Sequence, residues 1–160
     1  MAAVASQGWL IVTSPDNFEI SRDRGFDLAG VKAVHRDAAK KLAPGDKIAF
    51  YVTKIEAFAA TAQALSPTLE QPEPVIWKSR EPNEVYPFRF AIRVDAVCPP
   101  GRYVPAETLI DSLEFVRKWP REHWRLAFQG NLHHLPVPDY ERIRRAIQAL
   151  GGGGAPPSSP

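Results

Sequence analysis

Three short segments of the chain combine aromatic side chains with amides and hydroxyls, the residue types from which a nucleobase pocket is built. They are residues 9–17, which begin with Trp9 and end with Asn17, residues 86–90, and residues 119–131. Aromatic planes stack on the faces of a base, and amide and hydroxyl groups pair with its Watson–Crick edge. Each segment alone is equally typical of core packing, because buried and base-stacking aromatics look alike in a sequence.

The residue types that carry catalysis or bind metals are scattered along the chain. The four histidines have no cysteine or carboxylate at the spacing of zinc ligands. Cys98 precedes two prolines at the end of a strand pattern, which is typical of a buried structural thiol. Outside the terminal glycines there is no glycine-rich phosphate loop. We therefore expect a non-catalytic protein without a metal or another cofactor.

Strand and helix patterns alternate along the chain and would position these segments. Alternation or strong β preference predicts strands over residues 9–13, 46–53, 87–97 and 132–137. Residues 56–65 fit either a helix or a strand, and the short turn before them favours a strand. Helices are predicted over residues 14–22, 35–42, 106–116, 121–128 and 140–150. Such short strands and helices indicate a small curved or barrel-like sheet with helices packed around it.

One long segment, residues 66–82, contains four prolines among charged residues and is predicted to lack regular structure. Its single large apolar element is Val75-Ile76-Trp77. Terminal residues 1–7 are predicted to be flexible, and residues 151–160, which are only Gly, Ala, Pro and Ser, to be disordered. One folded domain is then expected over residues 8–150.

The composition of the chain restricts the cellular compartment in which it is expected and the kind of partner that it can bind. The single cysteine excludes an internal disulfide, and no apolar run approaches the ~20 residues of a membrane span. No signal-peptide pattern is visible, so a cytoplasmic protein that does not bind membranes is expected. A net charge of +2 permits an anionic partner without requiring one.

An ordered set of sequence pieces resembles the EVE domain of the PUA-like superfamily. The pieces are WLIVTSPDNF at 9–18, AGVK at 29–32, PGDKIAFY at 44–51, YPF at 86–88, FQG at 128–130 and LP at 135–136. The resemblance implies an α+β fold, a pseudo-barrel of five or six mostly antiparallel strands with peripheral helices, related to the YTH readers of methylated adenine. It also implies a module that holds a modified base flipped from DNA, in preference to RNA, with any effector on a separate protein.

The resemblance also implies which residues form the base pocket. They are Trp9, Ser14, Asn17, Gly30, Val31, Tyr86, Phe88, Phe128, Gln129 and Gly130, with Trp77 of the long loop as an addition. Family members commonly carry tryptophan immediately before Gly-Val, where this chain has Ala29. If that tryptophan is a wall of the pocket, Phe26 or Trp77 has to replace it.

Basic side chains near these segments are the candidates for phosphate contacts. They are Lys32, Arg36, Lys40, Arg117, Arg121 and Arg125. Each true phosphate contact would lower the affinity by roughly one decade per decade of salt. If these side chains only keep the surface soluble, no such dependence follows.

Two other functions could use the same pocket. A nuclease or hydrolase acting on nucleotides needs a group of perturbed pKa in the pocket, and Lys32 and Tyr51 are the candidates. A shallow apolar groove without a basic rim would instead indicate a module that binds small molecules or proteins.

Overall fold

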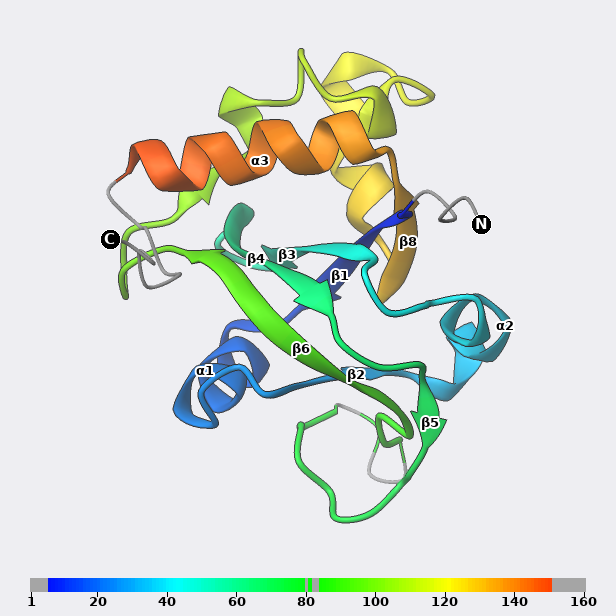
Figure 1. Cartoon of the computed structure of the whole chain (residues 1–160). Helices are drawn as coiled ribbons and strands as arrows, with labels where there is room; N and C mark the ends of the chain where they lie inside the picture. Colours follow the sequence, from blue (N-terminus) through cyan, green and yellow to red (C-terminus); the bar gives the residue numbers. More distant parts are fainter. Residues whose placement is uncertain (1–5, 80, 82–83, 151–160) are drawn as a thin grey trace, which may run out of the picture.

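One curled, mixed sheet (Figure 1) contains the predicted strands and three more in the computed structural model, which describes residues 6–79, 81 and 84–150. Its six main strands lie in the order β2-β6-β4-β3-β1-β8, while β5 pairs with β6 and β7 with β4. Among the described residues only the β1–β3 pair is parallel. The strands are β1 (Gly8–Thr13), β2 (Leu28–Val31), β3 (Lys47–Val52), β4 (Ala57–Ala64), β5 (Leu69–Glu70), β6 (Phe88–Val97), β7 (Val104–Pro105) and β8 (Leu132–Leu135). The predicted fold class is confirmed.

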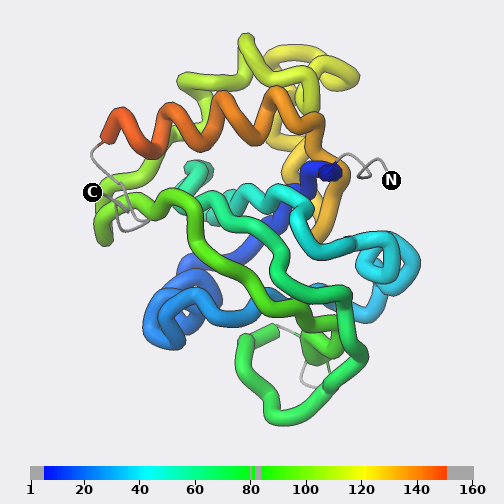
Figure 2. Tube along the Cα trace, in the orientation of Figure 1, coloured from blue at the N-terminus to red at the C-terminus, as the bar shows by residue number. Residues whose placement is uncertain are grey.

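Both faces of the sheet are buried, and β1 shows why its sequence is an unbroken apolar run. Successive side chains of a strand point to opposite faces. Trp9 and Ile11 enter the core on the side of α1 (Pro15–Asp23), whereas Leu10 and Val12 enter the second core, which α3 (Val137–Ala149) covers. In Figure 2 the blue segment of β1 runs through the middle of the molecule, beside β8.

Helix α1 begins as the sequence predicts. The Ser14 hydroxyl accepts a hydrogen bond from the backbone N–H of Asn17 (3.1 Å), and Pro15 takes the first helical position. The predicted helix over 35–42 is a 3₁₀ turn, η1 (Ala33–His35), followed by the short α2 (Arg36–Lys40).

The predicted helix over residues 106–116 is wrong. Two separate 3₁₀ turns, η2 (Ala106–Thr108) and η3 (Glu114–Val116), stand in its place. The buried carboxylate of Asp139 accepts hydrogen bonds from the backbone N–H groups of Glu114 (3.0 Å) and Phe115 (2.8 Å). This side chain takes the donors that a continuous helix would use. A further 3₁₀ element, η4 (Arg121–Phe128), is kinked at His123.

Several other expectations are resolved by the structure. Strand β2 was not predicted, whereas the irregular course of residues 66–82 is interrupted only by β5 in the described part of the chain. Cys98 is buried as expected, and burial raises the pKa of its thiol. The predicted flexible termini lie outside the described residues except for Ser6 and Gln7, and Gln7 is held by the Asp46 carboxylate. No described helix has the length and apolarity that a membrane crossing needs.

Candidate functional site

Two adjoining cavities lie where β1 ends, between α1 and the loop that precedes β6. The inner cavity holds only about 20 Å³ of water-accessible space, and its walls include the apolar side chains of Ile11, Phe18 and Phe50. The outer cavity is a cleft of about 1750 Å³, a volume that includes its open mouth. Both are lined by Thr13, Asn17, Tyr86 and Asn131. The site therefore has a mostly apolar inner end and a polar entrance.

Trp77 is the main aromatic wall of the inner cavity. Its indole is 5% exposed and packs so closely on the backbone of Gly30 that a Cβ atom there would lie 2.3 Å from the ring. The ring nitrogen donates to the Ser21 hydroxyl (3.0 Å), and the Tyr86 ring meets the indole edge to face at 5.9 Å. Trp77 thus lies next to Ala29–Gly30, where the family tryptophan would be, whereas Phe26 packs on Phe18 in the core.

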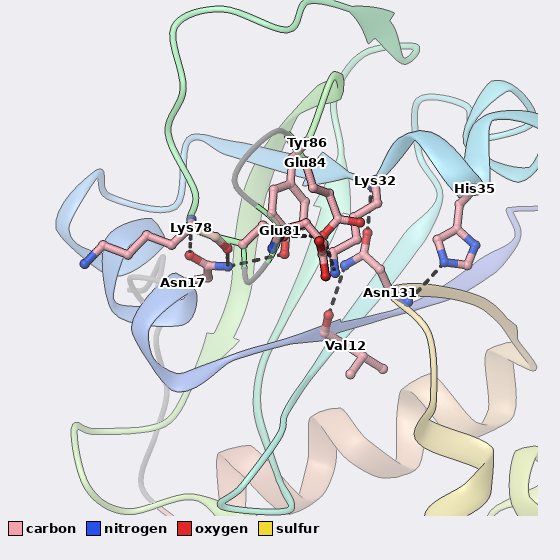
Figure 3. A network of polar contacts seen from close by, with 10 residues as sticks. Val12, Asn17, Lys32, His35, Lys78, Glu81, Glu84, Tyr86 and Asn131 are labelled. Atoms are coloured by element: carbon pink, nitrogen blue, oxygen red, sulfur yellow. Dashed lines mark hydrogen bonds and ion pairs between the residues drawn. The ribbon is translucent and has the colours of Figure 1, made fainter.

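The amide of Asn17 is engaged by the same loop (Figure 3). Its Nδ2 donates to the carbonyl of Lys78 (2.8 Å), and its Oδ1 accepts from the Lys78 backbone N–H (2.7 Å). Nδ2 also contacts the Tyr86 hydroxyl at 3.4 Å. Asn17 lines both cavities, but in this structure its hydrogen bonds hold the loop.

Asn131 joins three elements at the floor of the cleft (Figure 3). Its Nδ2 donates to the carbonyl of Val12 (2.9 Å), and its Oδ1 accepts from the backbone N–H of Lys32 (3.0 Å). Its own backbone N–H donates to Nε2 of His35 (3.1 Å). Asn131 ends the third aromatic segment of the sequence, residues 119–131, but it is not among the pocket residues that the family resemblance implies, which stop at Gly130.

The contact with Asn131 requires a neutral His35, because Nε2 must present a lone pair. Burial lowers the pKa of His35, and the neighbouring His133 and Lys32 lower it further. A lowered pKa means that the unfolded chain binds more protons than the folded one, so stability rises with pH.

We predict that His35 contributes stability above its ordinary pKa of 6.5, and that this contribution is lost as the pH falls toward the lowered folded value. Urea denaturation at pH 7.5 and at about pH 5.5 measures the effect. His35→Gln offers an amide oxygen as the acceptor and does not titrate, so this variant should lose less stability on acidification. Burial also lowers the pKa of His133, so His133 contributes the same pH-dependent loss of stability to the wild type and to the variant. Equal losses in both would contradict the role of His35.

The outer cavity carries charges of both signs. Lysines and acidic residues face it in equal number: Lys32, Lys54, Lys78, Asp16, Glu81 and Glu84. The Lys32 ammonium lies 3.3 Å from the Glu84 carboxylate and 5.6 Å from the centre of the Tyr86 ring. The pKa of Glu84 is lowered by a hydrogen bond from the Ser79 hydroxyl and by Lys32. No group of His, Cys, Asp and Glu in the described residues has an arrangement that could hold a metal ion.

The structure brings most of the predicted pocket residues together. Those that line at least one cavity are Ser14, Asn17, Gly30, Trp77, Tyr86, Phe128, Gln129 and Gly130. Trp9, Val31 and Phe88 line neither and are buried in the core below. Trp9 is fully buried there because its ring nitrogen donates to the Asp46 carboxylate (2.9 Å) and its ring stacks on His134. Residues that line the cavities without having been predicted include Thr13, Ser21, Lys54 and Lys78.

Of the six predicted phosphate contacts, the structure places only Lys32 at the cleft. Three of the others are paired with carboxylates elsewhere: Arg36 with Glu70 (3.7 Å), Arg121 with Asp111 (2.7 Å) and Arg125 with Glu56 (2.5 Å). Lys40 and Arg117 are exposed but line neither cavity. The basic residues at the cleft are instead Lys32, Lys54 and Lys78.

Tyr51, the other candidate for an enzymatic role, also lies away from the cavities. It stacks on Phe128 at 4.1 Å between ring centres, inside the second core. Burial raises its pKa to about 12, so its hydroxyl stays protonated at neutral pH. Lys32 remains in the cleft, but the Glu84 carboxylate is paired with it.

The curled sheet and its peripheral helices are similar in fold to YTH domains. A YTH domain-containing protein Mmi1, solved as an RNA complex, is similar with a TM-score of 0.60 and 12% identity, over 92% of this chain and 89% of that one. The YTH domain of the Zygosaccharomyces rouxii MRB1 protein, in complex with N6-methyladenosine RNA, has a TM-score of 0.59 and 17% identity, over 92% and 93% of the two chains. At these identities the likeness shows the fold.

The chain belongs to the EVE domain family, whose sequence model matches residues 7–145. A UPF0310 protein of Pyrococcus abyssi is 28% identical over 147 residues, which cover 87% of this chain and 98% of that protein. The resemblance read from the sequence is therefore confirmed.

Proposed function

We propose that this protein is a non-catalytic reader that holds a modified nucleobase of a nucleic acid at the paired cavities. The observation that carries the proposal is the meeting of Trp77 and Tyr86 with Asn17 and Asn131 at one site that opens to solvent. Aromatic rings stack on a base, and the Thr13 hydroxyl and the Gln129 amide, which also line the cleft, can pair with its edge. The YTH domain that was solved with N6-methyladenosine RNA supports the same use of this fold.

In this proposal the base lies where the outer cleft meets the inner cavity, beside Tyr86, and the sugar–phosphate backbone stays in the outer cleft. The inner cavity is mostly apolar, as base stacking requires. The outer cleft is polar, and Lys54 and Lys78 are the side chains that could contact phosphates there beside its three acidic residues. The family resemblance favours DNA, and the solved YTH complexes contain RNA, so both nucleic acids belong in the test.

The test is a titration of tryptophan fluorescence with single- and double-stranded DNA and RNA oligonucleotides. Each set carries cytosine, 5-methylcytosine, 5-hydroxymethylcytosine, adenine or N6-methyladenine at one position. Tight binding that prefers one modified base is the expected result. Failure of every oligonucleotide to bind, even at low salt, would overturn the proposal.

We predict that Lys54→Gln and Lys78→Gln each flatten the salt dependence of binding. Removing one phosphate contact should lower the slope of log affinity against log salt by roughly one. Binding titrations at three or more salt concentrations measure the slope. Arg121→Gln is the matched control, because Arg121 is paired with Asp111 and does not line the cleft. A flatter slope for Arg121→Gln alone would show that the backbone follows another surface.

A further inference from the structure

Trp77 is held in place by side chains that come from distant parts of the chain. It lies in the long segment between β5 and β6, yet its indole is only 5% exposed. A long loop without regular structure pays a large entropy cost when it becomes ordered, and such loops are commonly functional. The contacts that hold this loop therefore determine whether Trp77 is in place as the aromatic wall of the inner cavity.

Asn17 binds the loop at the residue next to Trp77. It is 3% exposed, and its amide forms two short hydrogen bonds with the backbone of Lys78, one in each direction. This pairing copies the exchange of N–H and C=O bonds between two β-strands. A side chain that is buried and bonded in this way fixes both the position and the direction of the backbone at residue 78.

Arg89 and Ser21 hold the same loop from two other sides. Arg89 is 3% exposed, and its guanidinium donates to the carbonyls of Tyr86 (3.0 Å) and Pro74 (2.6 Å). The guanidinium carbon also lies 5.5 Å from the centre of the Trp77 ring. Since Arg89 is the cross-strand partner of Gly30, the indole packs on adjacent residues of β2 and β6.

We propose that Asn17 is a positioning residue that presets the Trp77 wall, and that it does not read the edge of the base. This inference rests on the proposed function. A reader of the base edge discriminates between bases, so its loss changes which base is preferred. A positioning residue sets the fraction of molecules whose wall is in place, so its loss weakens binding of every base by one common factor.

The test combines binding with ¹⁹F NMR of protein labelled with 5-fluorotryptophan. The chain has four tryptophans, and the Trp77→Phe variant assigns the resonance of residue 77. In Asn17→Ala without ligand, we expect the Trp77 resonance to shift or broaden while the other three stay unchanged. If the wall is in place in about a tenth of the molecules, affinity falls about tenfold for each oligonucleotide and the ratio of modified to unmodified base is unchanged.

Asp16→Ala is the matched control, because Asp16 lines the outer cavity from the same helix turn but is exposed. It should leave the Trp77 resonance unchanged. Asn17→Asp keeps an acceptor for the Lys78 N–H but loses the donor to the Lys78 carbonyl, so it should move the same resonance, which keeps the test decisive if Asn17→Ala fails to fold.

An unmoved Trp77 resonance in Asn17→Ala, or a changed base preference, would overturn the positioning role and leave the proposed function intact. A shifted resonance with undiminished affinity would overturn it as well. If the wild-type protein binds no oligonucleotide, the proposed function fails, whereas the ligand-free spectra still decide whether Asn17 holds the wall.

Discussion

Gly30→Ala is expected to weaken oligonucleotide binding about as much as Trp77→Ala, although it removes no atom from the site. An added Cβ would lie 2.3 Å from the Trp77 ring, so the indole has to move away from β2. The backbone of β2 is extended there, and alanine itself is not strained. Loss of one stacking partner costs ~1–3 kcal/mol, or roughly 5-fold to 150-fold in affinity.

A double-mutant cycle separates this displacement from a general loss of structure. In the Trp77→Ala background the clash no longer exists, so adding Gly30→Ala should cost nothing more. The measurements are fluorescence anisotropy titrations with a labelled oligonucleotide that carries the preferred base. Losses that simply add in the double variant would contradict a displaced indole.

Asn131→Ala is expected to destabilise the fold by about 2–3 kcal/mol, because two backbone groups would lose their hydrogen-bond partner. These are the buried carbonyl of Val12 and the N–H of Lys32, which belong to different elements. Urea denaturation followed by circular dichroism measures the change.

Gln129→Ala is the control for this prediction, since Gln129 is exposed and lines the same cleft two residues away. It should stay within about 0.5 kcal/mol of the wild type. An equally small change for Asn131→Ala would show that water replaces its amide and that the floor of the cleft does not depend on it.

The elements that could be predicted from the sequence are those whose signals are local. Ser14 and Pro15 mark the start of α1, and alternation marks β3 and β6. Strand β2 escaped prediction because Leu28–Val31 is short, contains a glycine and is stabilised by pairing with the distant β6. The helix over 106–116 was wrong because Asp139, far along the chain, takes its N–H groups.

The site residues that lie in the family's sequence motifs could be predicted. Those that only folding brings to the site could not. The polar residues Ser14 and Asn17 and the ring of Tyr86 do line the cavities. Trp9 does not, because it lies near the start of β1, and on its face of the strand the next residue, Ile11, is the one that reaches the inner cavity. The position of the Trp77 indole depends on contacts with Gly30, Ser21 and Arg89, which only the folded chain brings together.

The bond between Asn131 and Val12 joins residues 119 positions apart, and it has a consequence for the order of folding. Strand β8 pairs with β1 beside it, so the first and last strands of the sheet meet at the site. Contacts of such long range form late and slow the folding of a small domain. During synthesis, a ribosome must have released nearly the whole domain before the cleft can close. A nascent chain that lacks β8 therefore exposes one edge of β1, and binding competence should arise only in the final step of folding.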